Sequence, residues 1–277
     1  MELTKKGLNG FQIKIVALIL MTFDHIHYMF SGVTGAPMWL SMLGRISAPL
    51  FIFMVANGMR YTKSREKYLL RLYIGSLFMN IANSLVDKYF PHPTGGVMIA
   101  NIFSTLFIIC LLIYAGGKIK ESVKTKSYGK MVLFTLILLI PLLSSVGLIM
   151  LMNSISESNI VLLRIIMTFV PSIFFTEGGF MFVILGMGFY LCGKSKSKTA
   201  IFYVIYCIAI FCMNIAKGIT LTALFTINIQ WFMILALPII LLYNNQKGRS
   251  LKYFFYLYYP IHIYGLLGLA ILTNHFM

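Results

Sequence analysis

Apolar segments, most of them long enough to cross a bilayer, follow one another along almost the whole chain. A membrane-spanning helix needs about 20 apolar residues to cross about 30 Å of hydrocarbon. The pattern predicts an all-α fold, a polytopic integral membrane bundle in which residues 1–277 form one membrane-embedded domain. We expect the first segment to be retained, because it is longer than the apolar core of a signal peptide. The segments lie at residues 11–30, 37–59, 69–87, 97–116, 131–152, 178–193, 200–216, 228–243 and 254–273.

Composition and charge support a membrane protein. Hydrophobic residues make up 59% of the chain and charged residues only 11%, which excludes a water-soluble globule. The net charge of +16 comes from short basic clusters between apolar segments, so we read them as topology signals and expect no nucleic-acid partner. Placing every cluster on the cytoplasmic side gives a consistent arrangement with the N-terminus inside. The clusters lie at residues 5–6, 60–67, 118–130, 194–198 and 247–252.

One apolar segment does not fit this alternation. If residues 160–175 crossed the membrane fully, the basic cluster at 194–198 would lie outside. The segment holds Arg164 and Pro171 and is followed by a Thr-Glu-Gly-Gly break that includes Glu177. We therefore predict a re-entrant or interfacial segment that lines a cavity, since irregular backbone is tolerated at membrane depth only there. The expected count is nine to ten transmembrane helices.

Ionisable residues interrupt the first apolar segment, where the chain reads MTFDHIHYMF. An aspartate at the bilayer centre costs about 2.5–3.5 kcal/mol, so such groups usually face a cavity and serve a function. Asp24 shares a helix face with His27, whereas His25 points about 100° away. Arg45, in the second segment, is expected at a similar depth. Either Asp24 and Arg45 form a structural ion pair, or Arg45 fixes Asp24 or an anionic substrate beside a titratable imidazole.

A polar stripe follows the third segment at helical spacing. Ser76, Asn80, Asn83 and Asp87 share one helix face. Two interpretations remain open: these side chains bond neighbouring helices together, or Asn80 and Asn83 line a substrate cavity. Cysteines occur without metal-ligand spacing, and we expect neither a disulfide framework nor a metal site.

Four stretches of the chain, in order, resemble the TraX family. They read KIVALILMTFDHI, GRISAPLFIFMVANGMRYTKSREKYLLRL, EGGFMFVILGMGFYL and QWFMILALPIILLYNNQKGRSLKYFFYLYYPIHIYGLL. TraX proteins are named for a membrane enzyme that acetylates the N-terminus of conjugative pilin, and they are similar to the wider transmembrane acyltransferase superfamily. The resemblance implies an acetyltransferase of a bacterial-type cell membrane, with acetyl-CoA as acyl donor and no metal. The acceptor is left open among a peptide, a sugar and a lipid.

The resemblance also points to particular residues. The family's Asp-His block falls on Asp24 and His25, its GR-x-S-x-P-x-F arginine on Arg45, and its terminal YP-x-H block on Tyr259 and His262. Its acidic EGG block falls on Glu177.

Acyl transfer needs a base and suits histidine, whose pKa lies near operating pH. We predict direct transfer with His25 as general base, Asp24 as its electrostatic support and Arg45 as the partner of Asp24. His27 is the reserve base. His262 is expected in the cytoplasmic half of an acyl-CoA tunnel, below the chemistry. The expected acyl-CoA contacts are Arg60, Arg71, Lys247, Tyr259 and His262, with Lys63, Arg249 and Lys252 as further candidates for its phosphates. The expected cavity residues are His27, Asn80, Asn83, Arg164 and Glu177.

Two other functions fit the same residues. A proton-coupled transporter or channel would use the buried charges as a relay, although the chain has no inverted repeat. A non-catalytic assembly factor is the third interpretation. Transfer of label from acetyl-CoA separates the enzyme from both.

Overall fold

The computed structural model describes residues 6–97, 101–154 and 160–277, with the side chains of 160–164 and 252 excepted. It divides into two units, residues 1–54, 90–97 and 191–277 in the first and residues 55–89 and 98–190 in the second. In the described ranges the structure is helical, and the β-structure there is an isolated bridge between Leu8 and Tyr243. The prediction of an all-α chain is confirmed.

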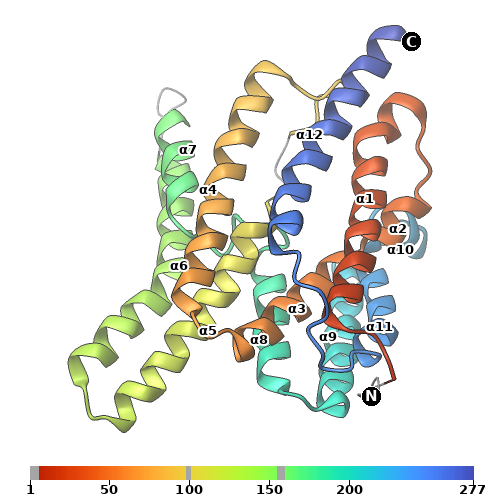
Figure 1. Ribbon diagram of the computed structural model, residues 1–277. Coiled ribbons are helices and arrows are strands. Elements are labelled where there is room, and N and C mark those ends of the chain that lie inside the picture. Colours follow the sequence, from red (N-terminus) through yellow and green to blue (C-terminus); the bar gives the residue numbers. More distant parts are fainter. Residues whose placement is uncertain (1–5, 98–100, 155–159) are drawn as a thin grey trace. The chain divides into compact units, whose positions relative to one another are not determined.

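The first unit is built around two long helices that lie side by side, α1 and α12 (Figure 1). The shorter elements α2, α9, α10, η2 and α11 complete it. Their bounds are α1 Gly10–Thr34, α2 Trp39–Gly44, α9 Lys196–Ala216, α10 Leu221–Thr226, the 3₁₀ helix η2 Ile229–Ala236, α11 Leu237–Leu241 and α12 Lys252–Phe276.

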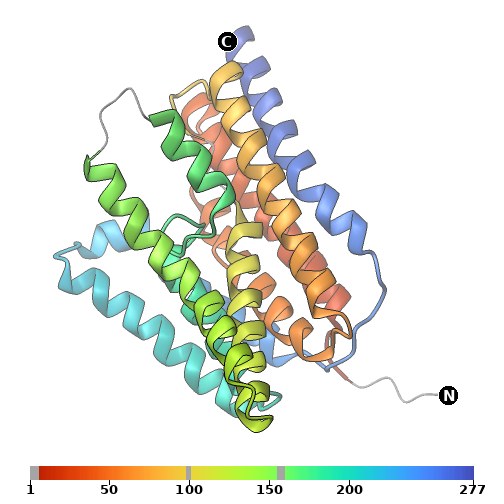
Figure 2. The same cartoon turned by 90° about the vertical axis from the view of Figure 1, so that its left-hand side faces the viewer.

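The second unit is a group of long helices in which α5 packs against both α4 and α6. Figure 2 shows α5 and α6 running antiparallel from the turn that joins them. α3 begins in the first unit and ends in the second. The bounds are α3 Ser47–Tyr61, α4 Arg65–Tyr89, α5 Ile102–Lys124, α6 Tyr128–Ser154, α7 Ile160–Phe169 and α8 Gly179–Cys192.

Seven helices within the described ranges are long and apolar enough to cross a membrane. They are residues 10–34, 39–61, 65–89, 102–124, 128–154, 196–216 and 253–276. The predicted spans at 178–193 and 228–243 correspond to shorter apolar helices, Gly179–Cys192 and Ile229–Leu241. Nine to ten crossings and a cytoplasmic N-terminus therefore remain predictions, while a multi-pass membrane bundle is supported.

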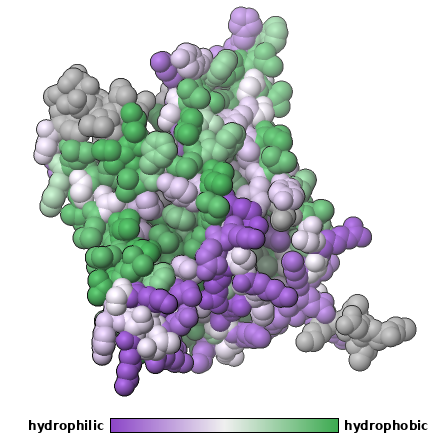
Figure 3. Space-filling model, turned by 60° about the vertical axis from the view of Figure 1, so that its left-hand side comes forward, coloured by the Kyte–Doolittle hydropathy of each residue, from purple (hydrophilic) through white to green (hydrophobic). Residues whose placement is uncertain are grey.

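Large apolar side chains on α6 face outward. Leu133, Leu136, Leu143 and Met150 are each more than half exposed, and Figure 3 shows hydrophobic side chains gathered on the face of this unit, with hydrophilic ones toward one end. Such a surface is unfavourable in water and suits a lipid environment.

The segment predicted to be broken is broken where expected. α7 ends at Phe169, and residues 170–178 form no helix. The backbone N–H of Ile173 donates to the Pro141 carbonyl at 3.1 Å and to the Ser145 hydroxyl at 2.8 Å, both on α6. Because Pro141 and Ser145 supply acceptors, the irregular backbone keeps its hydrogen bonds without water.

Candidate active site

The candidate site lies where α1 and α12 pack together. Both helices start at one end of the first unit, because the Gly10 N–H donates to the Gln246 carbonyl at 2.7 Å shortly before α12 begins. Phe11 meets Phe255 near these starts, with ring centroids 6.2 Å apart. His25 follows about 22 Å along α1 at 1.5 Å per residue, which is beyond its midpoint. The site therefore lies in the half of α1 away from its start.

Arg45 lies at a break between α2 and α3. The sequence predicted one continuous helix over 37–59, whereas the structure ends α2 at Gly44 and starts α3 at Ser47. Pro49 explains the break, because proline has no N–H for the carbonyl of Arg45 four residues earlier and its ring clashes with it. Arg45 thus lies at the junction of α2 and α3, with its own backbone still in the helical region.

Asp24 and Arg45 form an ion pair, which agrees with the structural interpretation and equally with the one in which Arg45 fixes Asp24. The Nη2 group of Arg45 donates to both carboxylate oxygens, and the Ser41 hydroxyl donates to Oδ1 at 2.6 Å. Gln230 on η2 accepts from Nη1 of Arg45 at 3.4 Å. The side chains of Arg45 and Asp24 are 28% and 24% exposed, so the pair is partly open to its surroundings.

Gly44 allows this close approach. A Cβ at position 44 would lie 2.3 Å from the Cβ of Asp24, a distance that real contacts do not reach. The backbone of α2 can therefore meet α1 at Asp24 only with glycine at this position.

His25 contacts His262 on α12. The Nδ1 of His25 lies 2.9 Å from the Nε2 of His262, and the ring centroids are 4.9 Å apart. His262 is buried, while His25 is partly exposed. The prediction that His262 lies below the chemistry is wrong, because its ring touches the predicted base.

Hydrogen-bond partners determine the tautomers of this pair. The Nδ1 of His262 lies 2.8 Å from the Tyr258 carbonyl, which only accepts, so this nitrogen carries the proton. In neutral His262 the Nε2 is then an acceptor, and His25 donates to it from Nδ1. The Met21 backbone also hydrogen-bonds the His25 ring. The Nε2 of neutral His25 therefore bears a lone pair.

Tyrosines of α12 surround the two imidazoles. The Tyr258 ring stacks on His262 at 5.0 Å, and its hydroxyl lies 2.8 Å from that of Thr22 on α1. Tyr259 is buried, with its ring centroid 6.4 Å from that of His25. These contacts fix the rotation of α12 that presents His262 to His25.

His27 has a different position. Its Nδ1 lies 3.0 Å from the Ala36 carbonyl, so the ring holds the loop that follows α1. Among the described residues, Asp24 bonds Arg45 and Ser41 rather than His25 or His27. The separation of Asp24 and His25 onto different faces agrees with the 100° expected of helix neighbours.

The residues expected to contact acyl-CoA are divided between the units. Arg60 donates to the carbonyls of Phe189 and Tyr190 at the end of α8, so its guanidinium is partly used there. Arg71 lies near the Tyr68 ring at 5.8 Å. Lys247 is exposed in the loop before α12 and belongs to the first unit with Tyr259 and His262.

The expected cavity residues other than His27 lie in the second unit. Asn80 accepts from Asn101 and donates to the Thr168 carbonyl at 3.2 Å, which supports the packing interpretation of the polar stripe. Asn83 is buried on the same helix. The Glu177 carbonyl accepts from the Thr105 hydroxyl at 2.7 Å. The side chain of Arg164 lies outside the described part of the structure.

Three residues of the site were missed from the sequence. Ser41 and Gln230 look like ordinary polar residues near helix ends, and their contacts depend on the α2 break and on η2. Tyr258 lies one turn before His262 at helical spacing, the one signal that pointed to it.

Comparison with known proteins now adds the family. The family model described as TraX protein matches residues 9–270. The chain belongs to the TraX family. This family is associated with pilin acetylation, which indicates a transferase. The match includes α1 and the part of α12 that carries His262.

One curated relative is a probable fimbrial assembly protein, FimC of serogroup H1, from Dichelobacter nodosus. It is 34% identical over 65 residues, which cover 23% of this chain and 27% of the relative. The chain thus matches about a quarter of that relative's length. No solved structure matches.

Proposed function

We propose that the protein is an integral membrane acyltransferase that moves an acetyl group from cytoplasmic acetyl-CoA to an amine or hydroxyl presented at the outer side. The contact between His25 and His262 carries this proposal. It supplies an oriented imidazole whose neutral form has a lone pair on Nε2 that can accept a proton, in a TraX family member with a membrane-spanning bundle.

The reaction is a direct transfer. The Nε2 of His25 removes a proton from the acceptor while the acceptor attacks the thioester carbonyl. A C–N or C–O bond forms, the C–S bond breaks, and the proton held by His25 passes to the leaving thiolate, giving CoA. A positioned base of this kind contributes about 10²–10⁴-fold in rate.

His262 is a positioning residue in this scheme. When His25 takes up a proton, its Nδ1–H already points at the Nε2 of His262, so the imidazolium keeps its hydrogen bond. The Tyr258 carbonyl holds His262 in the tautomer that can accept. Asp24 acts through space, because its carboxylate bonds Arg45 and Ser41, and its charge supports the imidazolium.

The acceptor is a peptide amine, a sugar or a lipid head group. The acetylation associated with the family favours an amine or hydroxyl over a thiol. Of the basic residues expected from the sequence to hold the donor's phosphates, Lys247 is exposed, whereas the Arg60 guanidinium already donates to carbonyls of α8. Tyr259, beside His25, is placed to contact the thioester.

A fimbrial assembly factor without catalysis is the second candidate, favoured by the name of the curated relative. A transporter that uses the buried charges is the third. The contact between His25 and His262 is compatible with all three candidates, and the family's association with pilin acetylation favours the enzyme over the other two.

Labelled acetyl-CoA separates these candidates. Full-length protein purified in detergent is incubated with [14C]acetyl-CoA and with membranes that supply the acceptor. An acyltransferase releases CoA and moves label into the membrane fraction in proportion to added protein. Label that stays on acetyl-CoA, in a preparation shown to be folded by its cooperative melting, contradicts the proposal.

A further inference from the structure

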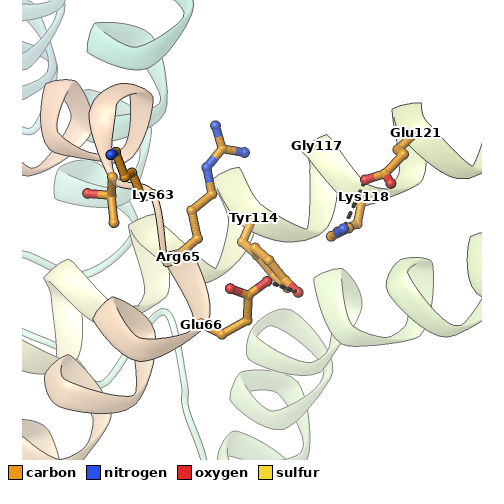
Figure 4. A pocket seen from close by; sticks show the side chains of 8 residues that line it. Lys63, Arg65, Glu66, Tyr114, Gly117, Lys118 and Glu121 are labelled. Carbon is orange, nitrogen blue, oxygen red and sulfur yellow. Dashed lines mark hydrogen bonds and ion pairs between the residues drawn. The ribbon is translucent and has the colours of Figure 1, made fainter.

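A charged cavity of about 320 Å³ lies within the second unit (Figure 4). It forms between the turn that joins α3 to α4 and the last part of α5. Three basic and two acidic side chains line it with Tyr114. These are Lys63, Arg65, Lys118, Glu66 and Glu121.

The acidic side chains of the cavity already have partners. Glu66 accepts from the Tyr114 hydroxyl at 2.9 Å, and Glu121 accepts from the Lys118 ammonium at 2.9 Å. Figure 4 shows both interactions, with Lys63 and Arg65 projecting separately. The carboxylates of Glu66 and Glu121 are thus held in place by Tyr114 and Lys118 rather than by Lys63 or Arg65.

Lys63 and Arg65 are the two basic side chains of the cavity that the acidic side chains do not bind, because Glu121 pairs with Lys118 and Glu66 with Tyr114. In the described part of the chain neither forms a hydrogen bond or an ion pair. Gly117 lies beside the guanidinium, since a Cβ there would stand 3.7 Å from Nη1 of Arg65, an ordinary contact distance. Arg65 also begins α4, where the helix dipole favours an anion.

We infer that this cavity binds the phosphate groups of the acyl-CoA donor, an inference that rests on the proposed function. A cavity with two unpaired cations, one of them a guanidinium with parallel donors, suits a phosphate ester. Its size lies within the range of small-molecule sites, about 300–1,000 Å³. It is built from charged residues at helix ends, where a membrane helix meets water, and the highly charged nucleotide of CoA has to stay in water.

From the sequence, the phosphate contacts were expected from Arg60, Lys63, Arg71 and the basic group at residues 247–252. Arg65 was read only as a topology signal, because loop cations commonly mark the cytoplasmic side. The cavity is what sets Lys63 and Arg65 apart; it requires the approach of α5 to the start of α4 and has no signature in the local sequence.

The test is CoA binding to full-length protein in detergent, measured by titration calorimetry. The double variant Lys63→Gln and Arg65→Gln should weaken binding of CoA about tenfold or more, because charge-assisted contacts to phosphate are lost. Lys67→Gln is the matched control, an exposed cation in the first turn of α4 that does not line the cavity. It should bind CoA as the unaltered protein does, and Arg65→Lys, which keeps the charge but loses the paired donors, should bind CoA more weakly than the unaltered protein and more tightly than the double variant.

The outcomes separate this inference from the proposed function. If the unaltered protein binds CoA and transfers label while the double variant binds CoA equally well, the cavity is not the phosphate site and the proposed function stands. If the unaltered protein neither binds CoA nor transfers label, the proposed function fails. Vesicles of phosphatidylglycerol test the other source of phosphate: a double variant that loses vesicle binding but keeps CoA affinity assigns the cavity to lipid and overturns the inference.

Discussion

The ion pair between Asp24 and Arg45 makes a quantitative prediction for stability. Arg45→Gln leaves the carboxylate with Ser41 as its remaining described donor. Removing one partner of a buried pair costs about 3–5 kcal/mol, whereas an exposed pair contributes about 0–1 kcal/mol. With about a quarter of each side chain exposed, we expect a loss of about 2–3 kcal/mol for Arg45→Gln and a similar loss for Asp24→Asn.

The double variant, which combines Asp24→Asn with Arg45→Gln, distinguishes pairing from two independent losses. With both charges removed, the two neutral amide side chains leave no unpaired ion in the partly buried site. The double variant should therefore be more stable than the sum of the single losses by about 1–2 kcal/mol.

Equilibrium unfolding in mixed micelles, followed by far-ultraviolet circular dichroism, measures all four proteins. The same cycle on Lys118 and Glu121, an exposed pair on α5, is the control and should show no measurable coupling. Additive losses at Asp24 and Arg45 would refute the reasoning.

Two further predictions concern packing. Gly44→Ala should destabilise the fold by about 1–3 kcal/mol, because the new methyl group overlaps Asp24. The melting temperature is the readout, and Gly58→Ala on α3, where a methyl group meets open space, is the control and should be neutral or stabilising. Equal melting temperatures for the two variants would contradict the close approach of α2 to α1. Asn101→Ala should lower the free energy of unfolding by about 0.6–2 kcal/mol, since it removes the hydrogen bonds that Asn101 donates to α4. Ser84→Ala on the exposed face of α4 is the control. A melting temperature for Asn101→Ala no lower than that of Ser84→Ala would argue against the packing role.

Most of the helices could be predicted from patterns within short stretches of the sequence. Helix-length apolar runs predicted the seven long helices, and helical spacing predicted that Asp24 and His25 lie on different faces. The Asp24 and Arg45 pair was also anticipated, because two opposite charges at similar depth in neighbouring helices have few other partners. These predictions depend on residues close in the chain or on adjacent helices.

Contacts between distant segments could not be predicted in the same way. His25 and His262 are 237 residues apart, and their contact depends on the packing of α12 along α1 and on its rotation. The sequence therefore assigned His262 to the wrong depth. It also left the polar stripe undecided, because Asn80 has the same spacing whether it faces a cavity or Asn101.

The role of His25 as general base is the central claim, and one comparison tests it most directly. Release of CoA from acetyl-CoA, in the presence of membranes that supply the acceptor, is measured for His25→Ala and His27→Ala at equal amounts of folded protein. We predict that His25→Ala loses about 10²–10⁴-fold in rate, while His27→Ala, whose ring holds the loop after α1, loses stability more than turnover. Turnover by His25→Ala close to that of the unaltered protein would contradict the account.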